Sequence, residues 1–161
     1  MSIEEAASLR VDEDGFFVLV VPDAYKGFVD EDWRLDELLG HFAGQMNEGA
    51  LFIAYPGPDD ADSAVAVTDR PITAPVLREA VGIVRVTASG LWLTDYTQLT
   101  MAAQFHDESP TGPAAVRLTT PVGWHRVLLR QIDGDPRLNL TITPIAAAIE
   151  RKRLSSVPWF E

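Results

Sequence analysis

The chain has 161 residues, with 24 Asp+Glu against 13 Lys+Arg and a formal net charge of −11 at pH 7. A chain of this length can bury roughly 70% of its unfolded surface in one core, so we expect residues 1–161 to form a single domain. The chain has no cysteine, which excludes disulfides, thiolate nucleophiles and zinc–thiolate sites.

The first ten residues, MSIEEAASLR, contain two glutamates and no basic segment followed by an apolar run. This pattern is not that of a secretory signal. No apolar stretch approaches the ~20 residues that a membrane-spanning helix needs. We therefore expect a cytoplasmic protein that does not contact a membrane.

One strand and one helix are predicted in the first third of the chain. The run from Phe16 to Val21 is apolar on both faces, which is typical of a central strand. The helix is predicted near residues 31–48, with Asp30 or Asp32 capping its start and Gly49 in a left-handed conformation after its end. Its apolar stripe consists of Leu35, Leu38, Leu39, Phe42 and Met46.

Two glycines, Gly40 and Gly44, lie one turn apart within this helix. Each costs about 1 kcal/mol relative to alanine in a helix interior. Close approach of the helix to another backbone would compensate for that cost, so the pattern predicts tight packing at both positions.

After Gly49 the sequence predicts a succession of short strands separated by turn residues. Short connections favour antiparallel hairpins, so we expect a mainly β chain, with α+β as the alternative class. The expected architecture is an antiparallel β-sandwich or partly open barrel of about eight strands, with a short C-terminal helix near residues 145–154. The remaining strands are predicted at 51–55, 64–68, 81–87, 91–100, 114–119, 124–132 and 138–143.

No catalytic or cofactor motif is present. His41, His106 and His125 lack the spacing of a zinc site, and the G-x-S-x-G, P-loop and G-x-G-x-x-G patterns are absent. The aspartates at 59–62 and 133–135 do not complete a calcium loop. The sequence predicts no catalytic residue, metal or cofactor, and its negative charge disfavours nucleic acid as a partner.

The excess of negative charge is confined to one segment of the chain. Residues 1–62 hold 15 Asp+Glu and 3 Lys+Arg, a balance of −12, whereas residues 63–161 hold 9 and 10, a balance of +1. Clustered carboxylates accelerate the encounter with a basic surface, although net charge also serves solubility alone. In composition the chain resembles bacterial immunity proteins and nuclease inhibitors, which are often small, acidic and poor in cysteine.

These features favour a non-enzymatic domain whose acidic segment docks on a basic protein partner. The hypothesis requires the carboxylates of residues 1–62 to gather on one exposed patch, and it leaves the oligomeric state open. Trp33 is the expected aromatic contact. The predicted partner-binding residues are Asp30, Glu31, Asp32, Trp33, Asp36 and Glu37.

The alternative is a small-molecule-binding or hydrolytic β-sandwich with a pocket around Trp124 and His125. Trp92 and Tyr96 would line the same pocket, since aromatic walls with a few polar groups are usual for small ligands. A separate prediction concerns the end of the chain, where we expect Trp159 and Phe160 to fold back onto the sheet.

Overall fold

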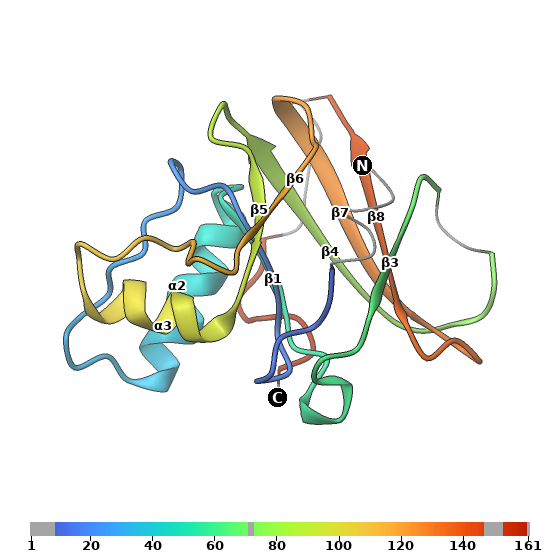
Figure 1. The fold of residues 1–161 in the computed structure, drawn as a ribbon, viewed down its shortest axis with the longest axis horizontal. Helices are drawn as coiled ribbons and strands as arrows, with labels where there is room; N and C mark the ends of the chain where they lie inside the picture. Colours follow the sequence, from blue (N-terminus) through green and yellow to red (C-terminus); the bar gives the residue numbers. More distant parts are fainter. Residues whose placement is uncertain (1–8, 71–72, 147–152, 161) are drawn as a thin grey trace.

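The computed structural model describes residues 9–70, 73–146 and 153–160 (Figure 1). Across these residues the chain forms eight strands, two α-helices and a short 3-10 helix, η1 (Pro58–Asp60). The strands form two four-stranded sheets, and neither sheet closes into a barrel within the described residues. The prediction of a mainly β chain with about eight strands is confirmed.

The first sheet has the order β2 (Leu51–Ala54), β1 (Phe17–Val20), β5 (Leu91–Thr94), β6 (Val116–Leu118), and every neighbouring pair is antiparallel. Every residue of β1 is buried. An apolar run can occupy this position because both faces of the strand are covered. The prediction that the first strand is central is therefore confirmed.

The second sheet has the order β3 (Val65–Thr68), β8 (Leu138–Pro144), β7 (Gly123–Ile132), β4 (Val76–Val86). β3 and β8 are parallel, so the expectation of antiparallel pairing throughout is wrong for this pair. The two strands lie far apart in the chain, and no tight hairpin fixes their relative direction. β4 is longer than predicted and forms the edge of the sheet beyond β7.

Helix α2 (Leu35–Asn47) begins later than predicted. The backbone of Arg34 is extended, and its N–H donates to Glu37 Oε1 at 3.1 Å, which fixes the first turn. Asp30 accepts the N–H of Asp32 at 3.0 Å in a turn before the helix, so neither aspartate is the cap. Gly49 follows the end of the helix with φ of 79°, as predicted.

The glycines of α2 do not approach another backbone, so the packing prediction is wrong. A Cβ built on Gly40 or Gly44 would meet no described atom within 4 Å, apart from chain neighbours and the helix itself. The close approach occurs instead at Gly82 of β4. A Cβ there would lie 2.6 Å from Phe52 Cδ1, because α2 and β2 pack against β4 on this side.

Helix α3 (Tyr96–Gln104) occupies much of the segment predicted as one strand at 91–100. The strand ends at Thr94 because Asp95 turns the chain, its carboxylate accepting the N–H of Gln98 at 2.7 Å. The spacing Asp-x-x-Gln is a capping signature that identifies this helix start. In Figure 1, α2 and α3 lie together at one side of the molecule, and β3, β4, β7 and β8 lie at the other.

The last described segment packs against the rest of the molecule without forming a helix. Ile145, Ala146, Arg153 and Leu154 are not helical, and the rest of the helix predicted at 145–154 lies outside the described residues. The N–H of Leu154 donates to the Asn47 side chain at 2.8 Å.

The fold-back predicted for the chain end is confirmed. The Phe160 ring lies 5.0 Å from that of Tyr55 and 6.2 Å from that of Phe16, measured between centroids. The Trp159 indole donates to the backbone of β4. None of the helices that the structure describes has the length and apolar character needed to cross a membrane.

Candidate functional site

The segment before α2 lies against the last turn of α3. The N–H groups of Val29 and Asp30 both donate to the carbonyl of Ala103, at 2.9 and 3.1 Å. The Phe28 and His106 rings meet edge to face with centroids 6.0 Å apart. Two loops that are distant in sequence, one leading into α2 and one leaving α3, therefore share a surface.

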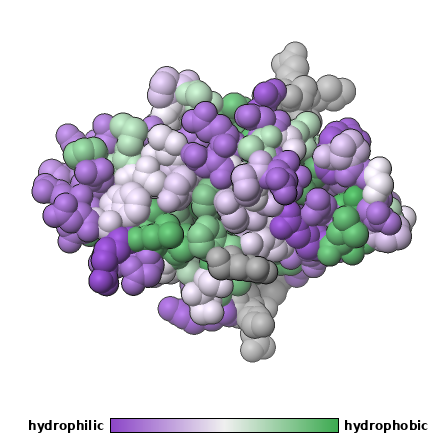
Figure 2. All heavy atoms as spheres, turned by 90° about the horizontal axis from the view of Figure 1, so that it is seen from below, coloured by the Kyte–Doolittle hydropathy of each residue, from purple (hydrophilic) through white to green (hydrophobic). Residues whose placement is uncertain are grey.

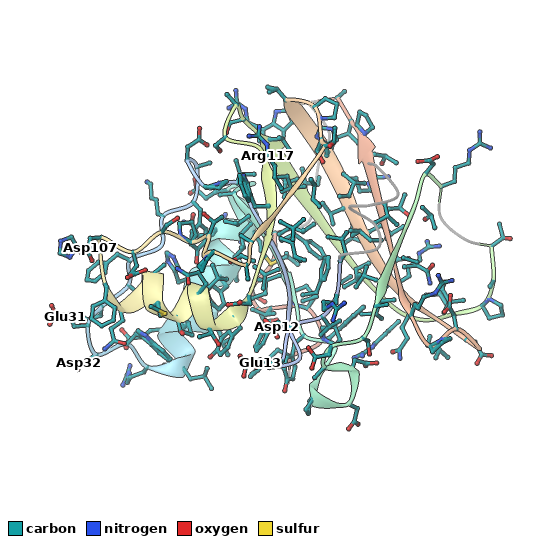
Figure 3. The ribbon with its side chains drawn as sticks, in the orientation of Figure 1. Asp12, Glu13, Glu31, Asp32, Asp107 and Arg117 are labelled. Atoms are coloured by element: carbon teal, nitrogen blue, oxygen red, sulfur yellow. The ribbon has the colours of Figure 1, made fainter. Side chains whose placement is uncertain are left out.

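Carboxylates from both loops gather on this surface. Figure 3 shows Glu31, Asp32 and Asp107 at the same end of the molecule. All of the carboxylate residues in the two loops and the first turn of α2 are exposed, and we call this surface the acidic end. It consists of Asp30, Glu31, Asp32, Asp36, Glu37, Asp107 and Glu108.

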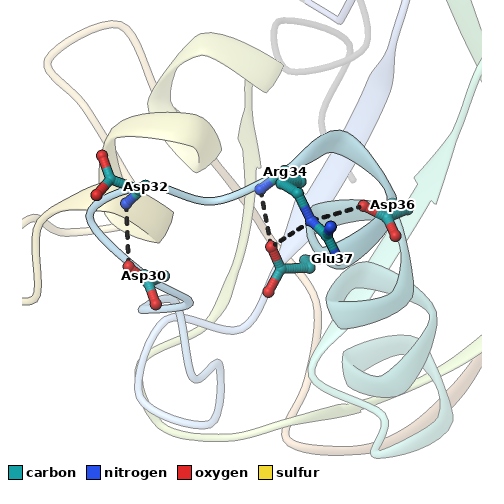
Figure 4. Close-up of polar contacts among 5 residues, drawn as sticks. All are labelled: Asp30, Asp32, Arg34, Asp36 and Glu37. Atoms are coloured by element: carbon teal, nitrogen blue, oxygen red, sulfur yellow. Dashed lines mark hydrogen bonds and ion pairs between the residues drawn. The ribbon is translucent and has the colours of Figure 1, made fainter.

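Arg34 lies among the carboxylates of the acidic end (Figure 4). Its Nε is 3.2 Å from Glu37 Oε1 and 3.6 Å from Asp36 Oδ1. These side chains are largely exposed, and ion pairs in water contribute less than about 1 kcal/mol to stability. Arg34 therefore orients two carboxylates without removing them from solvent, and the surface keeps an excess of negative charge.

Large apolar side chains are exposed beside these charges. Phe28, Leu35 and Phe105 are 46%, 48% and 46% exposed, and Met101 is 38% exposed. Viewed from below, hydrophilic residues cover the end where the helices lie and other parts of this face, and an apolar patch lies inward of that end (Figure 2). Apolar surface next to concentrated charge is the composition of a binding surface, because apolar contact supplies affinity and charge supplies steering.

Trp33, the aromatic contact that the docking hypothesis expects, keeps part of its side chain exposed. It is partly buried and packs against the hydrophobic core. Sequence reasoning did not find Phe28 and Phe105, the aromatic residues exposed at the acidic end, and it did not find Asp107 and Glu108. No local sequence pattern indicates these four residues, because it is the packing of α3 that brings its C-terminal loop to residues 28–30.

A second set of carboxylates lies away from the acidic end, as the labels of Asp12 and Glu13 in Figure 3 show. The N–H of Asp62 donates to the carbonyl of Asp12, which joins loops 12–14 and 59–62. The requirement that all carboxylates of residues 1–62 share one patch is therefore not met: of the segments described here, residues 30–37 lie at the acidic end, and loops 12–14 and 59–62 lie away from it.

Members of this second set have structural partners. Asp60 lies 3.2 Å from Arg78, and Asp14 accepts the hydroxyl of Thr97 at 3.0 Å. Burial raises the pKa of Asp12, and its hydrogen bonds with the backbone of Tyr96, Phe16 and Asp14 lower it in part. These contacts hold β1, β4 and α3 together, so the second set stabilises the fold.

The four residues proposed for a ligand pocket contact separate partners. Tyr96 stacks on Phe16 with centroids 4.3 Å apart, and the indole of Trp92 donates to the carbonyl of Ser89 at 2.7 Å. The Trp124 ring packs near Gly49, with the Arg85 guanidinium 5.8 Å from its centroid.

His125 is only 2% exposed, its Nδ1 lies 3.0 Å from the carbonyl of Gly123, and its Nε2 has no hydrogen-bond partner among the described residues. His125 lines a small hollow of about 110 Å³ together with Ile142 and Pro144, and Trp92, Tyr96 and Trp124 do not line it.

The partly buried His41 of α2 contacts Tyr25, which is buried in the segment that precedes the acidic end. Their rings meet edge to face at 5.8 Å, and neither His41 Nε2 nor the Tyr25 hydroxyl has a hydrogen-bond partner within the described residues. Burial lowers the pKa of His41 and raises that of Tyr25. Both side chains are therefore neutral at pH 7 and act as packing groups.

Within the described ranges, no group of three or more histidine, aspartate and glutamate side chains is arranged to hold a metal ion. Comparisons of the chain with family models, curated proteins and solved structures find no match. The functional assignment therefore depends on the surface itself.

Proposed function

We propose that this protein is a cytoplasmic, non-enzymatic protein-binding domain whose acidic end docks on a basic protein. The two sheets, in the sandwich arrangement that the sequence favours, serve as the scaffold. An inhibitor or immunity protein that binds a basic toxin or nuclease is the kind of protein that this chemistry fits.

The observation that carries the proposal is the convergence of charge from two distant segments. The loop before α2 carries Asp30, Glu31 and Asp32, and the loop after α3 adds Asp107 and Glu108 to the same surface. The local hydrogen bond that Asp30 accepts from Asp32 and the ion pairs of Arg34 leave these carboxylates exposed. Their charge is thus available to a partner.

The physical consequence is an electrostatic field that acts over a short range. At physiological ionic strength the Debye length is ~8 Å, so several carboxylates within that distance reinforce one another toward an approaching cation. Such a field raises association rates by about 10- to 1,000-fold and loses this effect in salt. Phe28 and Phe105 lie within the charged surface and supply apolar area that becomes buried on contact.

Affinity capture from a native lysate of the source cells, at 50 mM and 500 mM salt, tests the proposal. The test variant carries Glu31→Gln, Asp32→Asn and Asp107→Asn. The matched control carries Asp59→Asn, Asp69→Asn and Asp133→Asn, which removes the same charge from exposed positions away from the acidic end. Both variants retain every ion pair described above.

We expect the wild type and the control variant to retain the same basic protein at low salt and to release it at high salt. The test variant is expected to lose it at low salt. Equal capture by the two variants contradicts the proposal, because net charge alone then accounts for binding. Capture of no basic protein at low salt contradicts it as well.

A further inference from the structure

A second surface lies along the outer edge of β4, the edge that pairs with no other described strand. A groove of about 680 Å³ runs between this edge, the C-terminal end of α2 and the last described segment of the chain. Its apolar lining includes Met46, Val81, Ile83, Leu154 and Trp159.

Two contacts show which backbone groups of β4 face the groove side. The N–H of Arg85 donates to the carbonyl of Gly49 at 2.8 Å, and the carbonyl of Glu79 accepts from Trp159 Nε1 at 3.2 Å. Neither partner belongs to β7, so the backbone groups of Glu79 and Arg85 point away from the sheet.

Alternation along the strand extends this conclusion to the residues in between. In an antiparallel ladder, successive residues direct their N–H and C=O groups to opposite sides. The register pairs Gly82 with Val127 and Val84 with His125. Val81 and Ile83 therefore present their N–H and C=O groups to the groove, and Gly82 and Val84 bond to β7. A row of backbone donors and acceptors along a groove is the template for an added strand.

The charges in the groove select the chemistry of that strand. Arg126, which lies opposite Ile83 in the register, and Arg153 both line the groove and are exposed. Glu79 also lines it, but its carboxylate is paired with Arg130 at 2.6 Å. In a chain of net charge −11 this is a local excess of positive charge, and it complements carboxylates.

We propose that the groove beside β4 binds an extended peptide segment of alternating apolar and acidic residues, which adds as a strand along Val81 and Ile83. Backbone hydrogen bonds to these two residues hold the segment. Its side chains alternate between the two faces of the sheet: the apolar ones point to the side of Met46, which lies 3.7 Å from a Cβ built on Gly82, and the carboxylates point to the side of Arg126, which lies opposite Ile83. The added strand cannot extend past Glu79 or Arg85. The outward carbonyl of Glu79 already accepts from the Trp159 indole, and the outward N–H of Arg85 already donates to the carbonyl of Gly49.

Amide-detected NMR with defined peptides tests this proposal. The probe is a capped seven-residue peptide of alternating valine and glutamate. One control replaces each glutamate with lysine, and a second carries N-methyl groups on alternate backbone nitrogens, so that the donors facing β4 are lost while the side chains stay. We expect the largest shift changes at the amides of Val81 and Ile83, and we expect binding at least about fivefold weaker for the N-methylated peptide.

Variants of the protein separate the backbone and charge contributions. Val81→Pro removes the N–H donor that faces the groove and leaves the hydrogen bonds between β4 and β7 in place. Proline is tolerated at such a position, because the strand N–H that it lacks faces outward. Val81→Thr is the matched control, because it keeps the N–H. Val81→Pro is expected to weaken the probe about fivefold relative to Val81→Thr. Arg126→Gln is expected to weaken binding of the glutamate peptide about threefold and to strengthen that of the lysine peptide, because it removes a repulsion.

Three results overturn the proposal. The first is equal binding of the probe and its N-methylated form. The second is no binding of the glutamate peptide at millimolar concentration, which is also the result expected if the chain itself fills the groove. The third is a doubled solution mass that Val81→Pro abolishes, which assigns the edge to a second copy of the chain.

Discussion

The Asp12 carboxylate accepts the backbone N–H of Tyr96 at 2.7 Å, across 84 positions of the sequence. Its other oxygen accepts the N–H of Phe16 at 2.8 Å and that of Asp14 at 3.0 Å. One side chain thus fixes the turn before β1 and caps the first residue of α3. The position of α3, and with it the loop that completes the acidic end, depends on this contact.

Replacing Asp12 with alanine is expected to destabilise the protein by about 2–4 kcal/mol, because a partly buried backbone donor left without an acceptor costs roughly 1–3 kcal/mol. Chemical denaturation measures the change in the free energy of unfolding. Glu13→Ala is the matched control, since Glu13 is an exposed neighbour, and it is expected to stay within about 0.5 kcal/mol of wild type. An equal effect of both substitutions rules out this role of Asp12.

Gly40→Ala is expected to stabilise the protein by about 0.5–1 kcal/mol, because alanine restricts the unfolded chain and has room on the exposed side of α2. Gly82→Ala is the contrasting case and is expected to destabilise, because its Cβ would lie 2.6 Å from Phe52 Cδ1. Thermal unfolding of the two variants gives the comparison. A loss of stability in Gly40→Ala would show that α2 packs against something at this position.

His41 is expected to make stability depend on pH on the acidic side of neutrality. Burial lowers its pKa from 6.5, and a hydrogen bond with the backbone of Lys26 opposes this effect. Between the pKa of His41 in the folded protein and that in the unfolded chain, the unfolded chain binds more protons. His41 therefore does not lower the free energy of unfolding above pH 6.5, and it lowers this free energy as the pH drops toward the pKa of the folded protein.

The free energy of unfolding, measured at several pH values from 7.5 downward, tests this dependence. We expect the wild type to lose more stability on acidification than His41→Phe does, and NMR titration of the His41 ring to give a pKa below 6.5. Parallel pH profiles for the two proteins would show that another group is responsible.

Phe160→Ala is expected to lower stability by about 1–3 kcal/mol, because the ring packs on Tyr55 and Phe16 in the folded state. Phe28→Ala is the matched control, since Phe28 is 46% exposed and contacts His106 at the surface. Calorimetry of the two variants compares the two positions. A Phe160→Ala protein with wild-type stability and a changed solution mass would show that the residue mediates association instead.

Local patterns predicted the strands well, because each depends on side chains within a few residues. The run from Phe16 to Val21 gave the central strand, and the strand predicted at 138–143 matches β8. The prediction of one strand over residues 91–100 was wrong, because the apolar composition of this segment fits a strand as well as it fits a helix. The capping residues Asp95 and Gln98 carry the signal that distinguishes the helix.

The candidate site was less accessible to sequence reasoning. Residues 30–32 were identified by charge, but Asp107 and Glu108 join them only through the bonds from Val29 and Asp30 to Ala103. The groove beside β4 has no sequence pattern of its own. It depends on which strand lies at the edge of the sheet and on the return of Trp159 to that edge.

Hydrogen–deuterium exchange on the captured complex tests the central claim most directly, because it reports which backbone amides the partner covers. We predict slower exchange in residues 28–37 and 101–108 on binding, and unchanged exchange in residues 12–14 and 59–62. Protection confined to the second set of carboxylates, or to the edge of β4, would show that the acidic end is not the surface that binds the basic partner.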